Sequence, residues 1–257
     1  MTFEKHAGAA EFRAYALFER AGIPTPKVLG YDEASGLLSL EDLRETHASD
    51  WARADAMIDL TADLHAAFWD NYEAFGETGL PWRLENRKNF ERHCKAMEKD
   101  AKSYCRAHKM EAGEFRRALA YLRGEMRKLI EDRLHTGRNI TIIHGDLHPG
   151  NVLLPKEEGG QAVFVDLEAV RMGLGAEDLA MLLGLHLAPG KARALPLLER
   201  YHRRLSASAE GYSFGMLLEE YRIALAEALF FPVKLWKNGI DDAAMMGRAL
   251  QAWKEFV

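Results

Sequence analysis

The chain has 257 residues, 48% hydrophobic and 28% charged, which is enough to bury a substantial core in one large domain, or in a large domain with a small one attached. Lys and Arg number 34 against 39 Asp and Glu, giving a formal net charge of -5. Because no basic tract is interleaved with aromatic residues, nucleic acid is not expected as a partner.

The cellular context follows from the cysteines and from the apolar runs. Cys94 and Cys105 both lie in a charged, helix-like stretch, so a disulfide framework is not expected. No apolar run approaches the ~20 residues needed to cross a bilayer. The amino terminus carries charges where a signal peptide has its apolar core. We therefore expect a cytoplasmic protein without membrane contact.

Helical periodicity marks the first element, from 7 to 21, and Gly22 is placed to end it. Pro24 and Pro26 follow, and no helix contains such a pair. Apolar patterning then predicts two short strands and three helices, with Asp50 placed to cap the first of these helices. In chain order these elements are expected at 28–29, 37–40, 50–70, 86–108 and 111–135.

The pattern changes in the middle of the chain. A β-branched run at 139–143 is typical of a buried strand, and 144–150 is too rich in Gly and Pro for regular structure. Two apolar runs separated by a polar, Gly-containing turn predict a β-hairpin, whose parts are 152–154, 157–161 and 163–165. The chain from about residue 176 onward looks helical.

The register of this hairpin decides which polar side chains meet at its open end. A hairpin symmetric about 158–159 pairs Val152 with Val165 and Asn151 with Asp166. Residues directly opposite in an antiparallel pair point to the same face, with Cβ atoms ~4.5–5.5 Å apart. An amide oxygen and a carboxylate at that separation suit a hard cation such as Mg²⁺.

The loop before Asn151 carries a second carboxylate at a spacing typical of phosphoryl transfer. A protein kinase catalytic loop has the form H-x-D-x-x-x-x-N, in which the Asp accepts the substrate hydroxyl proton and the Asn holds metal. His144, Asp146 and Asn151 have this spacing, and Asp166 follows at the end of the next strand, where a second metal ligand is required. The chain departs from protein kinases by continuing D-L-E in place of D-F-G and by placing Gly145 where they have Arg.

The segments HGDLHPGNVLL, VFVDLEAV and EDLA closely resemble the aminoglycoside phosphotransferase and choline kinase family. The resemblance implies an α+β, protein-kinase-like fold with ATP bound between two lobes. The expected parts are an incomplete N-terminal lobe with hinge, 1–42, and a helical C-terminal lobe with the catalytic loop and metal site, 43–257. It further implies Asp146 as catalytic base and Asn151 and Asp166 as Mg²⁺ ligands.

Weaker parts of the resemblance concern the nucleotide. Leu38 to Leu43 resembles the family's hinge, which assigns Leu40, Glu41 and Leu43 to nucleotide binding, with backbone groups of Glu41 and Leu43 meeting adenine. Glu11 resembles the helix glutamate that pairs with the phosphate-binding lysine, and Lys5 is the candidate for that lysine. Asp178 in the EDLA segment is interpreted as support for the catalytic loop.

The amino terminus differs from the family. Its members carry two strands, a phosphate-covering turn and a lysine-bearing strand before the glutamate helix, whereas about ten residues precede Glu11 here. A misassigned start, a fragment and a shallow nucleotide site are three explanations. The N-terminal lobe is therefore expected to be incomplete.

The sequence thus predicts an ATP- and Mg²⁺-dependent kinase for a hydroxyl of a small molecule, such as an amino sugar or choline. Its acceptor pocket is expected between the helices after the hinge and those after Asp178. The first alternative is a non-catalytic kinase-like module that binds a nucleotide or partner. The second is a metal-dependent hydrolase using His144, Asp146 and His148. Glu168 is interpreted equally as a residue that binds substrate or metal and as a polar residue at the cleft edge. The sequence does not indicate the oligomeric state.

Overall fold

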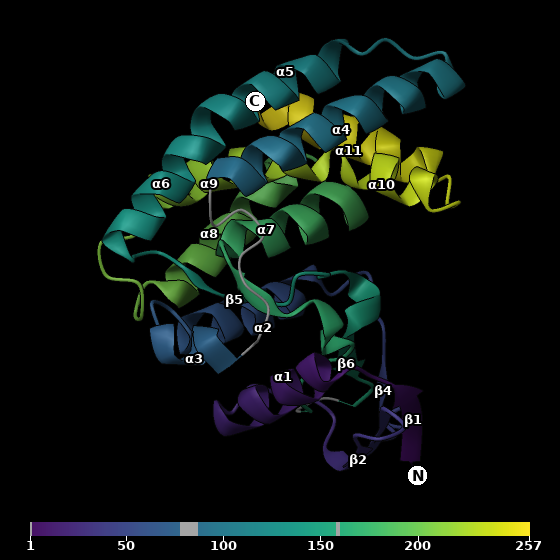
Figure 1. Ribbon diagram of the computed structural model, residues 1–257. Helices are drawn as coiled ribbons and strands as arrows, with labels where there is room; N and C mark the ends of the chain where they lie inside the picture. The colour runs from purple at the N-terminus through teal and green to yellow at the C-terminus, as the bar shows by residue number, and fades with distance from the viewer. Residues whose placement is uncertain (1, 78–86, 158–159) are drawn as a thin grey trace.

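The computed structural model describes residues 2–77, 87–157 and 160–257, which form a small sheet-bearing lobe and a larger, mostly helical lobe (Figure 1). In the small lobe three antiparallel strands pair in the order β1-β3-β2. The elements of this lobe are β1 (Thr2–His6), α1 (Ala9–Arg20), β2 (Val28–Asp32) and β3 (Leu37–Glu41). The central strand β3 buries Leu38 and Leu40, which belong to the hydrophobic core.

The ends of these elements follow from residues that form turns. Helix α1 ends before Gly22, which adopts φ +70°, a left-handed conformation that favours glycine, as the sequence predicts. After β2, the Asp32 carboxylate accepts hydrogen bonds from the Ala34 N–H (3.0 Å) and the Ser35 hydroxyl (2.6 Å). This tight turn begins where β2 ends, at Asp32, three residues beyond the predicted run. At its other end, away from the turn, β3 extends one residue beyond its predicted run, to Glu41.

The large lobe is a helical body that packs around the rest of the core (Figure 1). Its helices before the catalytic loop are α2 (Ala54–Ala67), α3 (Tyr72–Glu77), α4 (Arg87–His108), α5 (Gly113–Tyr121), η1 (Leu122–Met126) and α6 (Arg127–Thr136). Those after it are α7 (Gly175–Leu179), η4 (Ala180–His186), α8 (Lys191–Leu205), α9 (Phe214–Ala228), α10 (Phe231–Lys237) and α11 (Ala243–Phe256). The elements η1 and η4 are π-helical and continue α5 and α7 without a break.

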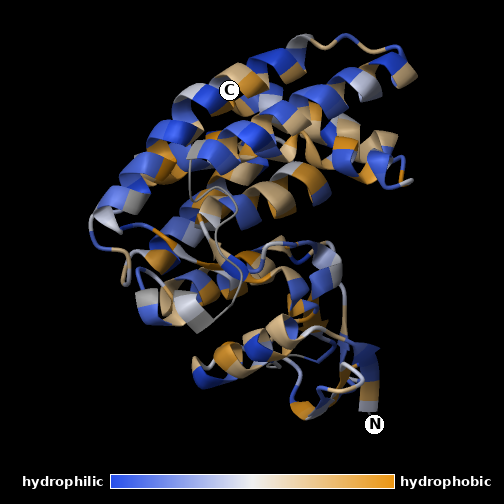
Figure 2. Ribbon diagram, viewed as in Figure 1, coloured by the Kyte–Doolittle hydropathy of each residue, from blue (hydrophilic) through white to orange (hydrophobic). Residues whose placement is uncertain are grey.

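Two predicted helices differ in detail from the observed ones. Helix α2 begins at Ala54, because the Asp50 carboxylate accepts the Ala52 N–H (2.9 Å) in a preceding turn and caps no helix. The helix predicted over 111–135 is observed as α5, η1 and α6 in succession. Figure 2 shows that hydrophilic residues dominate α5 and α6, which lie along one side of the helical body. A solvated helix face therefore explains the charge density of this segment.

Short strands connect the helical body to the small lobe. They are β4 (His47–Ala48), β5 (Thr141–Ile143), β6 (Val152–Pro155), β7 (Val163–Phe164) and β8 (Arg171–Gly173), with 3-10 turns η2 (Pro149–Asn151) and η3 (Leu167–Ala169). Strand β5 pairs antiparallel with β8, while β6 lies between β4 and β7. The α+β prediction is confirmed.

Among the residues that the structure describes, no helix has the length and apolar character needed to span a membrane.

The register predicted for the hairpin is wrong by one residue. Val152 pairs with Phe164, not with Val165, and the Val165 N–H donates to the Asn151 carbonyl (3.0 Å). Val152 and Phe164 are both fully buried, and burying this pair on the core face fixes the register. Asn151 therefore does not lie opposite Asp166 in the ladder. The predicted turn centre at 158–159 lies outside the described residues.

Candidate active site

The catalytic loop makes a tight bend at Gly145, between the end of β5 and Asp146. Gly145 has φ +79°, and a Cβ atom built there would lie 2.3 Å from the Ala169 carbonyl oxygen and 2.2 Å from Nη1 of Arg171. Backbone occupies the space into which a side chain would project, so only glycine fits. This close packing explains why the chain has glycine at the position that protein kinases fill with arginine.

Asp178 holds this loop from behind. One carboxylate oxygen accepts the His144 N–H (2.8 Å) and the other accepts the Gly145 N–H (2.9 Å). His65 of α2 adds a third hydrogen bond to Asp178 (3.2 Å) and contacts the Tyr201 hydroxyl through its other nitrogen (2.8 Å). Burial alone would raise the pKa of Asp178, but His65 and the other donors outweigh it and lower that pKa. The geometry supports the predicted architectural role.

The two loop histidines bond to the backbone. His144 is buried, and its Nε2 donates to the Val165 carbonyl (3.0 Å), which ties the loop to the end of the hairpin. His148 accepts the Gly150 N–H on Nδ1 (3.0 Å) and begins the 3-10 turn that leads to Asn151. These rings do not converge on a common ion position with Asp146. Zinc, which favours nitrogen and sulfur ligands, has no such site in the part of the chain that the structure describes.

Asn151 and Asp166 end the two strands of the hairpin. The Asn151 amide nitrogen donates to the Asp146 carbonyl (2.9 Å), so Asn151 fixes the loop that carries the acid. Asp166 has φ 60° and ψ 66°, in the left-handed region that few residues other than glycine adopt. Such a conformation persists only where the surroundings enforce it, and it is frequent at functional sites. Here it turns the chain directly after β7.

Lys5 joins the small lobe to this site. Its ammonium lies 2.9 Å from the Glu11 carboxylate of α1 and 2.6 Å from the Asp166 carboxylate. Burial alone would lower the pKa of Lys5, but Asp166 and Glu11 outweigh that effect and raise it. Burial raises the pKa of Glu11, which is only 2% exposed, and the Lys5 charge does not fully offset that effect. The structure thus brings together three site residues that the sequence predicts separately.

Glu168 forms an acidic cluster with the two acids that bind Lys5. Ligand oxygens of Glu11, Asp166 and Glu168 all lie within 4.8 Å of one another. Glu168 is exposed, whereas Glu11 is buried. Whether Glu168 binds substrate or metal or is a polar residue at the cleft edge stays a prediction.

The predicted hinge is the connection from β3 to the helical body. Leu40 is buried below it, and the Glu41 N–H donates to the Lys27 carbonyl (2.8 Å). The Leu43 carbonyl accepts the N–H groups of Thr46 and His47 (3.1 and 2.8 Å). The Glu41 carbonyl and the Leu43 N–H take part in none of these hydrogen bonds.

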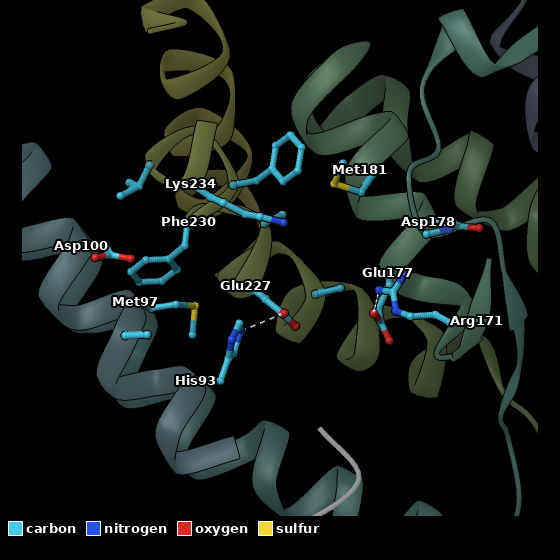
Figure 3. A pocket seen from close by; sticks show the side chains of 16 residues that line it. His93, Met97, Asp100, Arg171, Glu177, Asp178, Met181, Glu227, Phe230 and Lys234 are labelled. Atoms are coloured by element: carbon cyan, nitrogen blue, oxygen red, sulfur yellow. Dashed lines mark hydrogen bonds and ion pairs between the residues drawn. The ribbon is translucent and has the colours of Figure 1, made fainter. Parts of the chain in front are cut away.

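A cavity of about 340 Å³ lies beside the catalytic loop, where the sequence predicts an acceptor pocket. Gly145 and Asp178 form one end of it. The other walls come from α4, which follows the hinge, and from η4, α9 and α10, which follow Asp178 (Figure 3). The side chains in these walls are scattered in sequence and belong to no motif, so sequence reasoning misses them. They include His93, Arg171, Glu227 and Lys234.

The family model described as "Phosphotransferase enzyme family" matches residues 4–215 of this chain. The chain belongs to this phosphotransferase family. The prediction of a phosphotransferase is thereby confirmed, and the match includes Lys5, Glu11 and the whole catalytic loop. No curated protein sequence matches this phosphotransferase.

Solved structures show the fold. A choline/ethanolamine kinase family protein from Mesorhizobium loti has a TM-score of 0.61 at 17% identity, covering 98% of this chain and 78% of that one. Ethanolamine kinase from Plasmodium vivax has a TM-score of 0.63 at 11% identity, covering 99% and 75%. Amicoumacin kinase in complex with AMP-PNP and Ca²⁺ has a TM-score of 0.59 at 13% identity, covering 96% and 76%. The predicted protein-kinase-like, two-lobed fold of this phosphotransferase is confirmed.

Proposed function

We propose that this phosphotransferase is a small-molecule kinase that transfers the γ-phosphoryl group of ATP to an acceptor hydroxyl with the help of Mg²⁺. The observation that carries the proposal is the contact of Lys5 with both Glu11 and Asp166, beside the loop that holds Asp146. A cation and an acid from the first two elements of the chain meet a second acid, 161 positions from the cation, at the mouth of the hairpin. Phosphoryl transfer depends mainly on such positioning and on neutralising charge.

Asn151 and Asp166 would hold Mg²⁺. Both offer oxygen donors, which this hard cation prefers. The Asn151 amide nitrogen is already bonded to the Asp146 carbonyl, so its oxygen is the atom left for a ligand. When bound, Mg²⁺ supplies positive charge against the phosphate oxygens. The related amicoumacin kinase structure contains a nucleotide analogue together with a divalent cation, which supports a nucleotide and metal here.

The nucleotide would lie between the lobes, with 1–42 as the N-terminal lobe and hinge and 43–257 as the C-terminal lobe. Lys5 would contact the phosphates while Glu11 keeps its ammonium in place. At the hinge, the Glu41 carbonyl and the Leu43 N–H would bind the adenine edge over the Leu40 side chain.

Asp146 would act on the acceptor. Its carboxylate would orient the substrate hydroxyl and take its proton as the phosphoryl group is transferred. The Asn151 and Asp178 bonds to this loop hold Asp146 in place, so the acid is positioned before substrate arrives. The cavity next to Gly145 would hold the acceptor. A cytoplasmic location and the identity of the acceptor remain predictions.

Thermal unfolding with and without Mg·ATP tests the proposal. A ligand that binds only the folded state raises its stability by roughly 2.7 kcal/mol at 100 times its Kd. We expect a magnesium-dependent rise in unfolding temperature that Asp166→Ala abolishes and Asp146→Ala retains. Asp55→Ala, on the exposed surface of α2, is the matched control and should retain it too. An unchanged unfolding temperature at millimolar Mg·ATP would contradict the proposal.

A second measurement separates the kinase from a non-catalytic nucleotide-binding module. Both alternatives predict the thermal shift, but only the kinase forms ADP in an acceptor-dependent way. We expect Asp146→Ala to abolish this turnover while the shift with Mg·ATP persists. Full turnover in Asp146→Ala would refute its role as base.

A further inference from the structure

The charges that line the cavity beside Gly145 carry information about the acceptor. Ion pairs and hydrogen bonds within the protein satisfy most of them. Arg171 pairs with Glu177 at 2.7 Å, and Asp100 on α4 pairs with Lys237 at 2.8 Å. Asp178 is occupied by the catalytic loop.

Glu227 is also engaged inside the wall. Its carboxylate accepts a hydrogen bond from Nε2 of His93 (3.2 Å), and Figure 3 shows this bond across the floor between α4 and α9. Both side chains are partly buried, with 33% of His93 and 19% of Glu227 exposed. The acidic side chains of the cavity are therefore committed to partners within the protein.

Lys234 is different. It lies on α10 and lines the cavity, and Figure 3 shows its ammonium reaching in from that helix above Glu227. Among the residues in 2–77, 87–157 and 160–257, no carboxylate forms an ion pair with it within 4.0 Å. Lys237, one turn further along the same helix, does have such a partner in Asp100. Lys234 is thus a cation of the cavity wall without an internal counterion in the described structure.

We propose that the acceptor carries an anionic group, a carboxylate or a phosphate, that binds to Lys234. This inference rests on the proposed function, because it takes the cavity as the acceptor site. The acceptor hydroxyl lies at the Gly145 end, next to Asp146, and the anionic group lies at the α10 end. Apolar side chains of Met97, Met181 and Phe230 line the walls between these ends and contact the hydrocarbon part of the molecule.

The partners that these charges already have favour this class over a purely cationic acceptor. An ammonium group in the cavity would be repelled by Lys234 and would have to compete with His93 or Lys237 for a carboxylate. A carboxylate or phosphate instead gains a charge-assisted hydrogen bond from the exposed ammonium of Lys234, with which no carboxylate of the described wall forms an ion pair. Lys234 therefore selects acceptors by the sign of their charge.

A matched series of straight-chain alcohols tests the proposal. The members have equal length and end in a carboxylate, a phosphate, a neutral hydroxyl or an ammonium. Their Kd values for the full chain are measured by NMR titration, and acceptor-dependent ADP formation is measured in parallel. We expect the carboxylate or the phosphate to bind most tightly, and the comparison of these two identifies which anion the site takes.

Lys234→Gln should weaken binding of the preferred anionic alcohol roughly 10- to 100-fold and leave the neutral alcohol unchanged. Lys234→Glu should make the ammonium alcohol the best ligand. Lys254→Gln, the same change on the exposed face of α11, is the control and should have no effect.

The binding measurement tests the inference about Lys234, and the turnover measurement tests the proposed kinase function separately. An ammonium alcohol that binds most tightly, or a charge preference that survives in Lys234→Gln, would overturn the inference while kinase activity stands. Failure of every member to bind would overturn it as well. Lys234-dependent anion binding without any ADP formation would support the inference and contradict the proposed kinase function.

Discussion

The Lys5 ammonium lies 2.6 Å from the Asp166 carboxylate, although 161 positions of sequence separate the two residues. The first strand of the chain is thereby attached to the end of the hairpin that carries the proposed metal ligand. Lys5 is also bonded to Glu11, so one cation connects the small lobe to the catalytic lobe. Its side chain is 23% exposed, which leaves it accessible to a ligand from the cleft.

Substituting Lys5 should affect the nucleotide more than the fold. Lys5→Ala removes the cation from a partly exposed pair with Asp166, and such pairs contribute at most about 1 kcal/mol to stability. The buried Glu11 carboxyl, whose pKa burial already raises, can take up a proton once its cation is lost. We expect the Kd for Mg·ATP to rise by roughly 10-fold or more, since a charge-assisted contact is lost. Titration of Mg·ATP by calorimetry measures this change. Lys27→Ala, an exposed lysine in the same lobe, should bind Mg·ATP like the unmodified protein.

The sequence is sufficient to predict the catalytic loop because the chemistry of that loop is local. His144, Asp146 and Asn151 lie within eight positions of one another, and Asp166 follows at the end of the next strand. The contact of Lys5 with Asp166 depends on how β1 docks, so the sequence nominates Lys5 only through a resemblance. Symmetry about the turn mispredicts the hairpin register, because burial of Val152 against Phe164 fixes it instead.

Gly145→Ala should destabilise the protein and distort the loop. The new methyl group would lie 2.3 Å from the Ala169 carbonyl oxygen, at a residue whose φ of +79° is unfavourable for alanine. We expect a loss of about 2–4 kcal/mol in the free energy of unfolding. Urea denaturation measures it.

Gly247→Ala provides the matched control for this substitution. Gly247 lies on the exposed face of α11, and a Cβ atom there would meet nothing within 4 Å beyond its own helix and chain neighbours. The same change should there stabilise the protein by about 0.5–1 kcal/mol, because alanine favours helix. Equal effects at both positions would refute the packing argument for Gly145.

Asp178→Asn should loosen the catalytic loop by weakening the hydrogen bonds that hold it from behind. Asparagine has one carbonyl oxygen for the donors that two carboxylate oxygens now satisfy, so buried N–H groups lose partners. Each such loss costs about 1–3 kcal/mol, and we expect about 2–4 kcal/mol in total from thermal or urea unfolding. Turnover should fall as well. Asp63→Asn, which breaks the exposed pair with Arg204, should change stability by less than about 1 kcal/mol.

His186 should make stability depend on pH. Burial, with the neighbouring His148 and Arg248, lowers the pKa of His186 from 6.5 to about 4. As pH falls from 6.5 toward 4, His186 is protonated in the unfolded chain but stays neutral in the folded protein. Its contribution to the free energy of unfolding is therefore fully present above pH 6.5 and is lost on acidification. The loss amounts to roughly 2–3 kcal/mol.

His186→Phe should flatten this part of the pH profile. The aromatic ring keeps the contacts with His148 and Trp51, whose ring centroids lie 5.0 and 6.4 Å away, but it cannot be protonated. Urea denaturation at a series of pH values measures the slope for both proteins. A slope as steep in the variant as in the unmodified protein would assign the acid sensitivity to other groups.

The acceptor cavity cannot be predicted residue by residue, for a physical reason. Met97, Glu227 and Lys234 come from three helices, and each fits the amphipathic pattern of its own helix. Only the folding of the chain makes them neighbours in the lining of one cavity. The sequence therefore indicates which helices form the pocket, and not which side chains give it its charge.

The hydrogen bonds from Tyr201 through His65 to Asp178 also bear on how inactive variants of this enzyme are interpreted. Tyr201 lies on α8 and is not among the residues that line the cavity, so a survey of surface and pocket would class it as a purely structural position. A random mutagenesis screen for lost turnover should nevertheless recover substitutions at Tyr201 and His65. Such hits would identify the residues that support the catalytic loop. If only protein abundance were scored, the lost turnover of a natural variant at these positions would be attributed to a folding defect.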